Sequence, residues 1–394
     1  MPMPTLDERR SAVALLRRQV FGGSTEQVGP LLAALAEQEA ALAQAEKQGA
    51  RARGMIFSTD VQSPNLGPET TGLEAQCRLR MAQVPTAIAH LLDAGANPLI
   101  TCTVRNTADK TRRVRVTSFV QGYSADAIDS FEIKSGKDHS FDQLPTFFPG
   151  ALREIDELTR ATLHIKVDDL DGEIEVHRTQ PIWLLPQTTA PLAVKDPDKD
   201  TWSDLTRYLG AFVTPNAPAI QGLLHAAVER VPDRQFVSYQ AGAAGVAPQV
   251  KGLYEALKQA GIRYVNSVLA FSPDEGLSSQ RVRLPRQTLE SKNANCLDGT
   301  VLFASLLEAI TLRPAIVLVP GHAFVAWQTD PADDQSWTYL ETTVIGSMPF
   351  DEAVSVGAAR AKAFQDIVTP EAPHLFRRWA LQELRTRHDV LPME

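Results

Sequence analysis

The chain has 394 residues, a net charge of −8, and 22% charged beside 44% hydrophobic residues. That balance is ordinary for a globular protein and gives no reason to expect nucleic acid or an anionic membrane as a partner. The length predicts two to three domains. No apolar run approaches the roughly 20 residues needed to cross a bilayer. The first ten residues mix charges of both signs, so they do not predict a secretory signal.

Cysteine usage bears on the compartment. Cys77, Cys102 and Cys296 are three cysteines in a long chain, too few for a disulfide framework. We therefore expect free thiols and a cytoplasmic protein. No glycine-rich phosphate loop followed by Lys-Ser or Lys-Thr occurs, and we expect no cofactor.

Residues 1–57 predict a helical N-terminal region. An apolar stripe at helical spacing ends at Gly22-Gly23, and a second helix begins at Ser24, whose spacing to Gln27 matches a capping box. Residues 58–74 are rich in Ser, Thr, Pro, Gly and Asn, which predicts a linker.

Residues 75–187 predict an antiparallel β-sandwich of the immunoglobulin-like kind. Apolar residues alternate with polar ones near 100–104, 114–120 and 163–167, and Asp171-Gly172 is a strong hairpin signal. A second linker is expected over 188–200, where prolines and lysines gather. The chain is therefore predicted to be a multidomain α+β protein.

Residues 201–394 predict a mixed α/β domain that carries the chemistry. The last helical segment is amphipathic and is expected to dock on the domain as a terminal helix rather than bind a membrane. Besides the segments discussed below, helices are expected near 203–212, 217–230, 248–260, 350–366 and 374–388, and a strand over 264–271.

Cys296 opens an almost wholly apolar segment that predicts a buried helix. Asn295 is a favoured N-cap residue, and Asp298 falls in the first turn. Cys296 would then occupy the first helical position, where the helix dipole lowers a thiol's pKa and favours the thiolate. The alternative is a buried structural cysteine, which is the usual fate of a lone cysteine on an apolar helix.

His322 and Glu341 follow on two further predicted strands. The apolar run 315–319 is broken by Pro320-Gly321, and His322 begins the next run. If that strand and 337–343 pair symmetrically about the polar turn between them, Glu341 lies opposite Phe324. His322 and Glu341 then become diagonal neighbours on one face, roughly 7–8 Å apart at the backbone. Considered alone, His322 would be a core or strand-end histidine with its hydrogen bonds satisfied, and Glu341 would be a solvated carboxylate at a strand edge.

A thiol nucleophile, its base and an orienting acid in that order predict a catalytic triad of Cys296, His322 and Glu341. An oxyanion donor beyond the Cys296 backbone N–H is also needed. Gln287 is the preferred candidate, with Gln280 and Asn293 as competitors. Zinc binding by the same side chains is the alternative chemistry, although no closely spaced ligand pair supports it.

The stretch from about 281 to 352 resembles the core of the transglutaminase-like superfamily, cysteine enzymes on a papain-like scaffold. The segments that carry the resemblance are Arg283-Leu284-Pro285, 295–300, 302–309, 321–327 and 340–343. The resemblance implies a Cys-His-Asp triad, which falls on Cys296 as nucleophile, His322 as base and Glu341 as orienting acid. The third member departs from the family pattern, because this chain has Glu where Asp is usual.

We therefore expect a thiol-dependent acyl-transfer enzyme that acts on amide or peptide bonds, as a cysteine protease or amidase or as a transglutaminase-like acyltransferase. Hydrolysis is favoured because water is the default acceptor. The substrate would be a protein or peptide, and the N-terminal helices or the sandwich would recruit a protein partner. The alternative is a non-catalytic module that keeps the fold and binds a peptide in its cleft.

Overall fold

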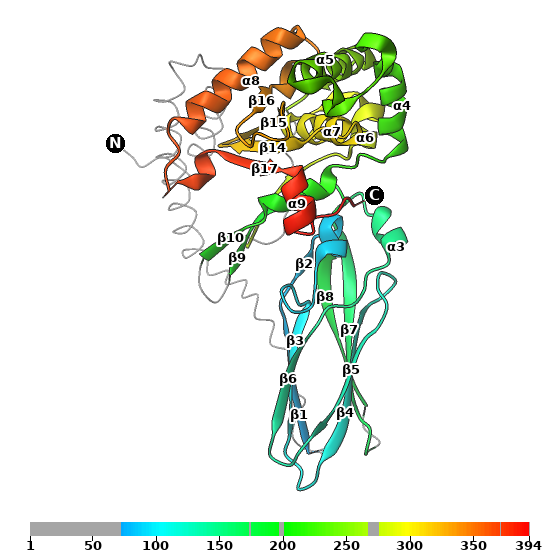
Figure 1. Ribbon diagram of the computed structural model, residues 1–394. Coiled ribbons are helices and arrows are strands. Elements are labelled where there is room, and N and C mark those ends of the chain that lie inside the picture. Colours follow the sequence, from blue (N-terminus) through cyan, green and yellow to red (C-terminus); the bar gives the residue numbers. More distant parts are fainter. Residues whose placement is uncertain (1–71, 173–174, 197–200, 267–275, 371, 394) are drawn as a thin grey trace, which may run out of the picture.

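The computed structural model describes residues 72–172, 175–196, 201–266, 276–370 and 372–393. In this part the chain is mixed α+β and holds five β-sheets (Figure 1). The helices expected over 1–57, and the linker up to residue 71, lie outside the described residues. Among the described residues, no helix has both the length and the apolar character that a membrane span requires.

Two sheets form the region that follows. One has the strand order β1-β3-β6 and the other β2-β8-β7-β4-β5. The elements, with η for a 3-10 helix, are β1 (Leu73–Leu79), β2 (Gln83–Val84), η1 (Thr86–Leu91), β3 (Ile100–Asn106), β4 (Arg112–Val120), β5 (Ala127–Ile133), β6 (Asp138–Gln143), α3 (Pro149–Arg153), β7 (Thr159–Asp169) and β8 (Glu175–Leu184).

Alternating side chains of both sheets build one apolar core. Val104 of β3, Val116 of β4 and Leu163 of β7 are fully buried in it. The strands predicted from the alternation of apolar and polar residues are therefore confirmed, and each has one face toward the other sheet. The expected hairpin is confirmed, because β7 and β8 pair antiparallel on either side of Asp171-Gly172. The first strand begins at Leu73, inside the segment expected to be a linker.

Cys77 and Cys102 form a disulfide, which corrects the expectation that the chain's cysteines stay free. The two residues lie directly opposite each other in the antiparallel pair of β1 and β3, and both are buried. Side chains at directly opposite positions of an antiparallel pair lie on the same face and are nearest neighbours, so the two sulfurs can meet. Composition missed this pair because 25 residues separate the cysteines and their contact depends on strand register.

The disulfide makes a direct prediction about thiol content. Protein unfolded in denaturant without reductant is expected to yield one reactive thiol, that of Cys296, and three after reduction. Maleimide labelling followed by intact-mass measurement checks this. Three labels without reductant would show that Cys77 and Cys102 are not bonded.

Residues 189–196 were expected to belong to a linker, but they form β9, the middle strand of the sheet β10-β9-β12. The prolines and lysines suggested an irregular segment. β9 is nevertheless paired on both sides, by β10 (Thr201–Asp204) and by β12 (Leu277–Arg281), a strand some eighty residues further along the chain.

The two regions of the molecule share an apolar contact. Ala87 and Ile88 of η1 belong to the core of the C-terminal region, and this packing joins the two regions.

The C-terminal region is built around the four-stranded sheet β16-β15-β14-β17. Its remaining elements are η2 (Thr206–Phe212), α4 (Pro218–Ala227), η3 (Val228–Arg230), η4 (Pro232–Arg234), η5 (Ser238–Ala241), α5 (Gly242–Ala260), β11 (Arg263–Tyr264), α6 (Pro285–Ser291), β13 (Asn293–Ala294), α7 (Cys296–Ala309), β14 (Pro314–Val319), β15 (His322–Gln328), β16 (Trp337–Leu340), η6 (Thr342–Val344), α8 (Phe350–Gln365), η7 (Pro373–Leu375), β17 (Arg377–Ala380) and α9 (Leu381–Arg387).

Helices cover both faces of this sheet. Ile316 and Val325 belong to the apolar core that contains α7, whereas Val317 and Phe324 pack with Phe364 of α8. Strands buried on both faces read as continuous apolar runs, which is why 315–319 showed no alternation. The internal position expected for that strand is confirmed, since β14 lies between β15 and β17.

The expected helices near 217–230, 248–260 and 350–366 correspond to α4 with η3, α5 and α8, and α5 ends at Gly261 in the left-handed conformation. In place of the α-helix expected near 203–212, β10 extends to Asp204 and the 3-10 helix η2 covers Thr206–Phe212. The segment 374–388 is only partly helical. Residues 377–380 form β17, because the open edge of β14 takes them as a fourth strand before α9 begins. Of the strand expected over 264–271, Tyr264 ends β11, and residues 267–275 lie outside the described part.

Close contact between α8 and β16 predicts a stability effect. A Cβ on Gly357 would lie 2.8 Å from backbone atoms of Tyr339 and Leu340, so Gly357→Ala must push α8 off the sheet. We expect a loss of roughly 1–3 kcal/mol in unfolding free energy, as for other overpacked cores. The control is Gly222→Ala in the exposed part of α4, where nothing lies within 4 Å of the added carbon and helix propensity favours alanine. Equal denaturation midpoints for the two variants would contradict this packing.

Candidate active site

The N-terminus of α7 fixes the position of Cys296. Asn295 is the N-cap, as expected, and its side chain accepts the backbone N–H of Asp298 at 2.8 Å. Asp298 returns the interaction by accepting the Asn295 N–H at 3.0 Å, which completes a capping box. The buried Asp298 carboxylate also accepts from the backbone N–H and from the guanidinium of Arg283, at 2.7 and 2.8 Å. Cys296 is therefore held at the first position of a firmly anchored helix.

A tight turn fixes the position of His322. β14 and β15 are joined by Pro320 and Gly321, and Val319 pairs with His322 across that turn. Gly321 has φ +71°, and proline followed by a glycine with positive φ is the pattern of a type II turn. His322 is thus the first residue of β15, on the strand that packs against α7.

The strand register follows the sequence prediction. β15 and β16 pair antiparallel from Val325 opposite Leu340 to Gln328 opposite Trp337, which is the symmetric arrangement expected. The ladder ends there, so Glu341 is not a paired strand residue opposite Phe324. It becomes the N-cap of η6 and accepts the backbone N–H of Thr343 at 3.1 Å.

His322 and Glu341 are joined by a hydrogen bond of 2.8 Å between Nε2 and Oε2. The side chains are 3% and 1% exposed, so the bond lies away from solvent. A carboxylate can only accept, which places the proton of the neutral imidazole on Nε2 and the basic lone pair on Nδ1. This is the geometry of a base oriented by an acid.

Opposing influences set the charge of this pair. Burial alone would raise the pKa of Glu341. Burial is outweighed by the positive charge of protonated His322 and its Nε2–H donor, by Arg360 and by the Thr343 donors. Together they hold the pKa of Glu341 at about 2. For His322, burial is the largest influence and lowers the pKa, the Glu341 carboxylate opposes it, and Arg360 adds to the lowering. The resting pair is therefore a neutral imidazole beside a carboxylate.

The Cys296 sulfur lies against the backbone amide of Ala323, the residue after His322. Burial raises the pKa of the thiol to about 11, and the Ala323 and Leu297 amides counter this only in part. The expectation of a lowered thiol pKa is wrong. Cys296 is only 9% exposed and lies near the negative Glu341, and these two effects outweigh the favourable effect of the helix N-terminus. The thiol is protonated at neutral pH.

Two further side chains belong to this site and were missed by sequence reasoning. Arg360 of α8 places its Nε 3.5 Å from Glu341 Oε2. Tyr264 of β11 is 37% exposed. Burial, followed by the charges of Cys296 and Glu341, raises its pKa to about 12. No motif marks either residue. Each reaches the site through tertiary packing, Tyr264 because β11 pairs in parallel with β13, the strand just before Cys296.

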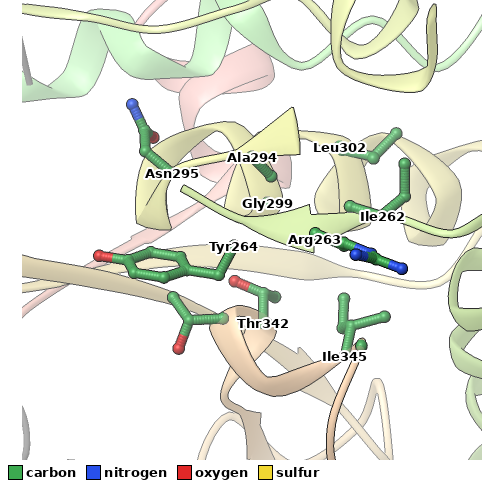
Figure 2. A pocket seen from close by; sticks show the side chains of 11 residues that line it. Ile262, Arg263, Tyr264, Ala294, Asn295, Gly299, Leu302, Thr342 and Ile345 are labelled. Carbon is green, nitrogen blue, oxygen red and sulfur yellow. The ribbon is translucent and has the colours of Figure 1, made fainter. Parts of the chain in front are cut away.

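A small pocket lies between the start of α7, β11 and η6 (Figure 2). Neighbours of Cys296 and Glu341 in the chain line it, but these two residues and His322 do not. Asn295, the N-cap of α7, and Gly299 of that helix form one wall, and Thr342 of η6 faces Gly299. Tyr264 extends along the same pocket toward the Asn295 side. The full lining is Ile262, Arg263, Tyr264, Ala294, Asn295, Gly299, Leu302, Thr342, Thr343, Ile345 and Gly346.

The oxyanion candidates are placed less favourably. Gln287 is the third residue of α6, and its Oε1 accepts the Leu284 N–H at 3.0 Å, so its amide caps that helix. That bond uses only the Gln287 oxygen, so its assignment as the oxyanion donor stays a prediction. Gln280 belongs to β12, and Asn293 is exposed in β13. The Cys296 backbone N–H, at the start of α7, stays the main-chain donor that the sequence offers for an oxyanion.

Cys296, His322 and Glu341 could in principle ligate zinc. Among the described residues, no group of three or more His, Cys, Asp or Glu side chains has the geometry to hold a metal ion.

No family model matches the chain and no curated protein matches it in sequence. A solved structure described as a FixG-related protein from Vibrio parahaemolyticus is similar to 28% of this chain and 95% of that chain. The sequence identity is 10% and the TM-score is 0.21, values that carry no argument about this protein. The resemblance to the transglutaminase-like superfamily therefore stays a prediction.

Proposed function

We propose that the protein is a thiol-dependent acyl-transfer enzyme that acts on amide or peptide bonds. The observation that carries this proposal is the buried 2.8 Å bond from His322 to Glu341, with the Cys296 sulfur against the next backbone amide. A structural histidine would be satisfied by one backbone carbonyl and would not require a second buried charge beside it. The arrangement matches a nucleophile, a base and an orienting acid.

The chemistry follows from the protonation states. His322 Nδ1 removes the thiol proton as the sulfur attacks the carbonyl carbon, and the carbonyl π electrons move to oxygen. The Cys296 backbone N–H stabilises that oxyanion. Imidazolium then protonates the leaving amine as the C–N bond breaks, leaving a thioester. Because thiol and imidazole both rest neutral, His322 acts as a general base in the attack itself.

The thioester is resolved by an acceptor. Water activated by His322 would give a peptidase or amidase, and an amine would give cross-linking. We propose hydrolysis, since water needs no dedicated binding site. The transglutaminase-like scaffold, the immunoglobulin-like character of the two-sheet region and recruitment of a protein partner through that region or the N-terminal segment are parts of the same proposal.

The cytoplasmic location expected from the cysteine content is also a part of the proposal, but the Cys77–Cys102 disulfide argues against it. Disulfides persist mainly in oxidising compartments. The thiol count described above, made on protein from its native host, distinguishes the two compartments. Three free thiols indicate a reducing compartment, and one indicates an oxidising compartment.

One observation favours a second function, a non-catalytic peptide-binding module. The Cys296 thiol is 9% exposed and its pKa is raised to about 11, as for an inert buried cysteine. In that case the pocket beside α7 would bind a peptide without reaction.

A proteome digest incubated with the active protein and with its Cys296→Ala form separates these functions. New peptide termini with the wild type alone support hydrolysis, and new isopeptide links with the wild type alone support cross-linking. Peptides retained equally by both forms, with no new bond made or broken, would overturn the enzyme proposal in favour of the binding module.

A further inference from the structure

Arg360 is a charged residue that the proposed mechanism does not use. It lies on α8, on the opposite side of the sheet from the Cys296 helix, and is 17% exposed in its side chain. Its Nε lies 3.5 Å from Glu341 Oε2, the oxygen that also accepts from His322. One carboxylate oxygen is thus shared between the imidazole and a guanidinium.

The scaffold holds this contact in place. Gly357 brings α8 against the backbone of Tyr339 and Leu340, and the Glu341 N–H donates to the Ala353 carbonyl of the same helix at 3.2 Å. Arg360 lies three positions after Gly357, so both lie on the face of α8 that meets the end of β16. A half-buried arginine held by this packing at 3.5 Å from the orienting acid is a built feature of the site.

We propose that Arg360 is a positioning residue that fixes the Glu341 carboxylate and keeps His322 in its neutral, basic form. This inference rests on the proposed function. Glutamate has one more methylene than the aspartate of the family pattern, and therefore one more torsion to restrain. Arg360 on one side and Thr343 on the other, with its Oγ1 donating to Oε1 at 2.7 Å, restrain both oxygens.

The charges around the pair give the direction of the effect. Glu341 faces His322 from β15 and Arg360 from α8, while Cys296 of α7 and Tyr264 of β11 lie within electrostatic reach. Glu341 favours imidazolium, and Arg360 disfavours it. Removing the guanidinium leaves the carboxylate uncompensated, so the pKa of His322 must rise. The acid limb of any reaction that needs neutral His322 would then move to higher pH.

The experiment is an NMR titration of the His322 imidazole in the full-length wild type, in Arg360→Gln and in Arg360→Lys. The His322→Ala spectrum assigns the resonance. Lys362→Gln is the matched control, since it removes an exposed positive charge from the same helix. Circular dichroism and melting curves establish that each variant is folded.

For Arg360→Gln we expect a rise of roughly 0.5–1 pH unit in the His322 midpoint, with wild-type behaviour in Lys362→Gln and most of the shift reversed in Arg360→Lys. Wild-type midpoints in both Arg360 variants would overturn the proposal. If Arg360→Gln fails to fold, Arg360→Met replaces it as the neutral variant, with the same rise expected, and Arg360→Lys stays the charged comparison. The titration needs no substrate, so a negative result is distinct from failure of the proposed enzyme function, which would appear as Cys296 reactivity independent of His322.

Discussion

His322→Ala is expected to lower kcat/KM for thiol-dependent cleavage by roughly 10³-fold while leaving the fold intact. The variant removes the proposed base, and a buried thiol whose pKa is about 11 stays almost wholly protonated at neutral pH. Glu341→Gln is expected to cost about 10²-fold, because a side-chain amide can donate to Nε2 and stabilise the tautomer with its proton on Nδ1.

His225→Ala is the matched control for this prediction, since it removes an exposed histidine from α4. The measurement is single-turnover cleavage of a peptide found in the proteome screen, with melting curves for every variant. Wild-type cleavage in His322→Ala would mean that another group activates the thiol. Equal losses in His225→Ala and His322→Ala would mean that the effect is not local.

Asp298→Ala is expected to produce the largest loss of stability. The carboxylate is fully buried, joins Arg283 at 2.8 Å and accepts three backbone or guanidinium donors around the start of α7. Removing one partner of a buried ion pair leaves the other charge unpaired, which costs about 3–5 kcal/mol in unfolding free energy. The loosened helix terminus would also displace Cys296 and reduce cleavage.

Glu229→Ala is the control for Asp298→Ala, because Glu229 and its partner Arg234 are 55% and 73% exposed in their side chains. Exposed pairs of this kind contribute less than about 1 kcal/mol. Denaturant midpoints measure both, and adding Arg283→Met to Asp298→Ala should restore part of the loss. A change below 1 kcal/mol in Asp298→Ala would contradict a structural role for this ion pair.

Local sequence signals predicted the parts of the site that depend on short-range order. The cap formed by Asn295 and Asp298 needs only two residues three positions apart. The pairing of β15 with β16 needs only a turn and matched apolar faces. That register was enough to bring His322 and Glu341 together, although their contact is made just beyond the last paired residue, Leu340.

The parts that sequence reasoning missed depend on partners far along the chain. β9 is a strand because β12 pairs with it, and residues 377–380 form β17 because β14 has an open edge. Arg360 contacts Glu341 through the packing of α8, which no periodicity reveals. The rise in the Cys296 pKa likewise follows from burial, a quantity that the helix-terminus argument did not include.

The most direct test of the central claim is the rate at which iodoacetamide alkylates Cys296 in native protein at neutral pH, located by peptide mass spectrometry. We expect the labelling rate to fall at least tenfold in His322→Ala and to be unchanged in His225→Ala. Labelling of the wild type and His322→Ala at the same rate, or no labelling of Cys296 in either until the protein unfolds, would contradict a functional pair of thiol and imidazole.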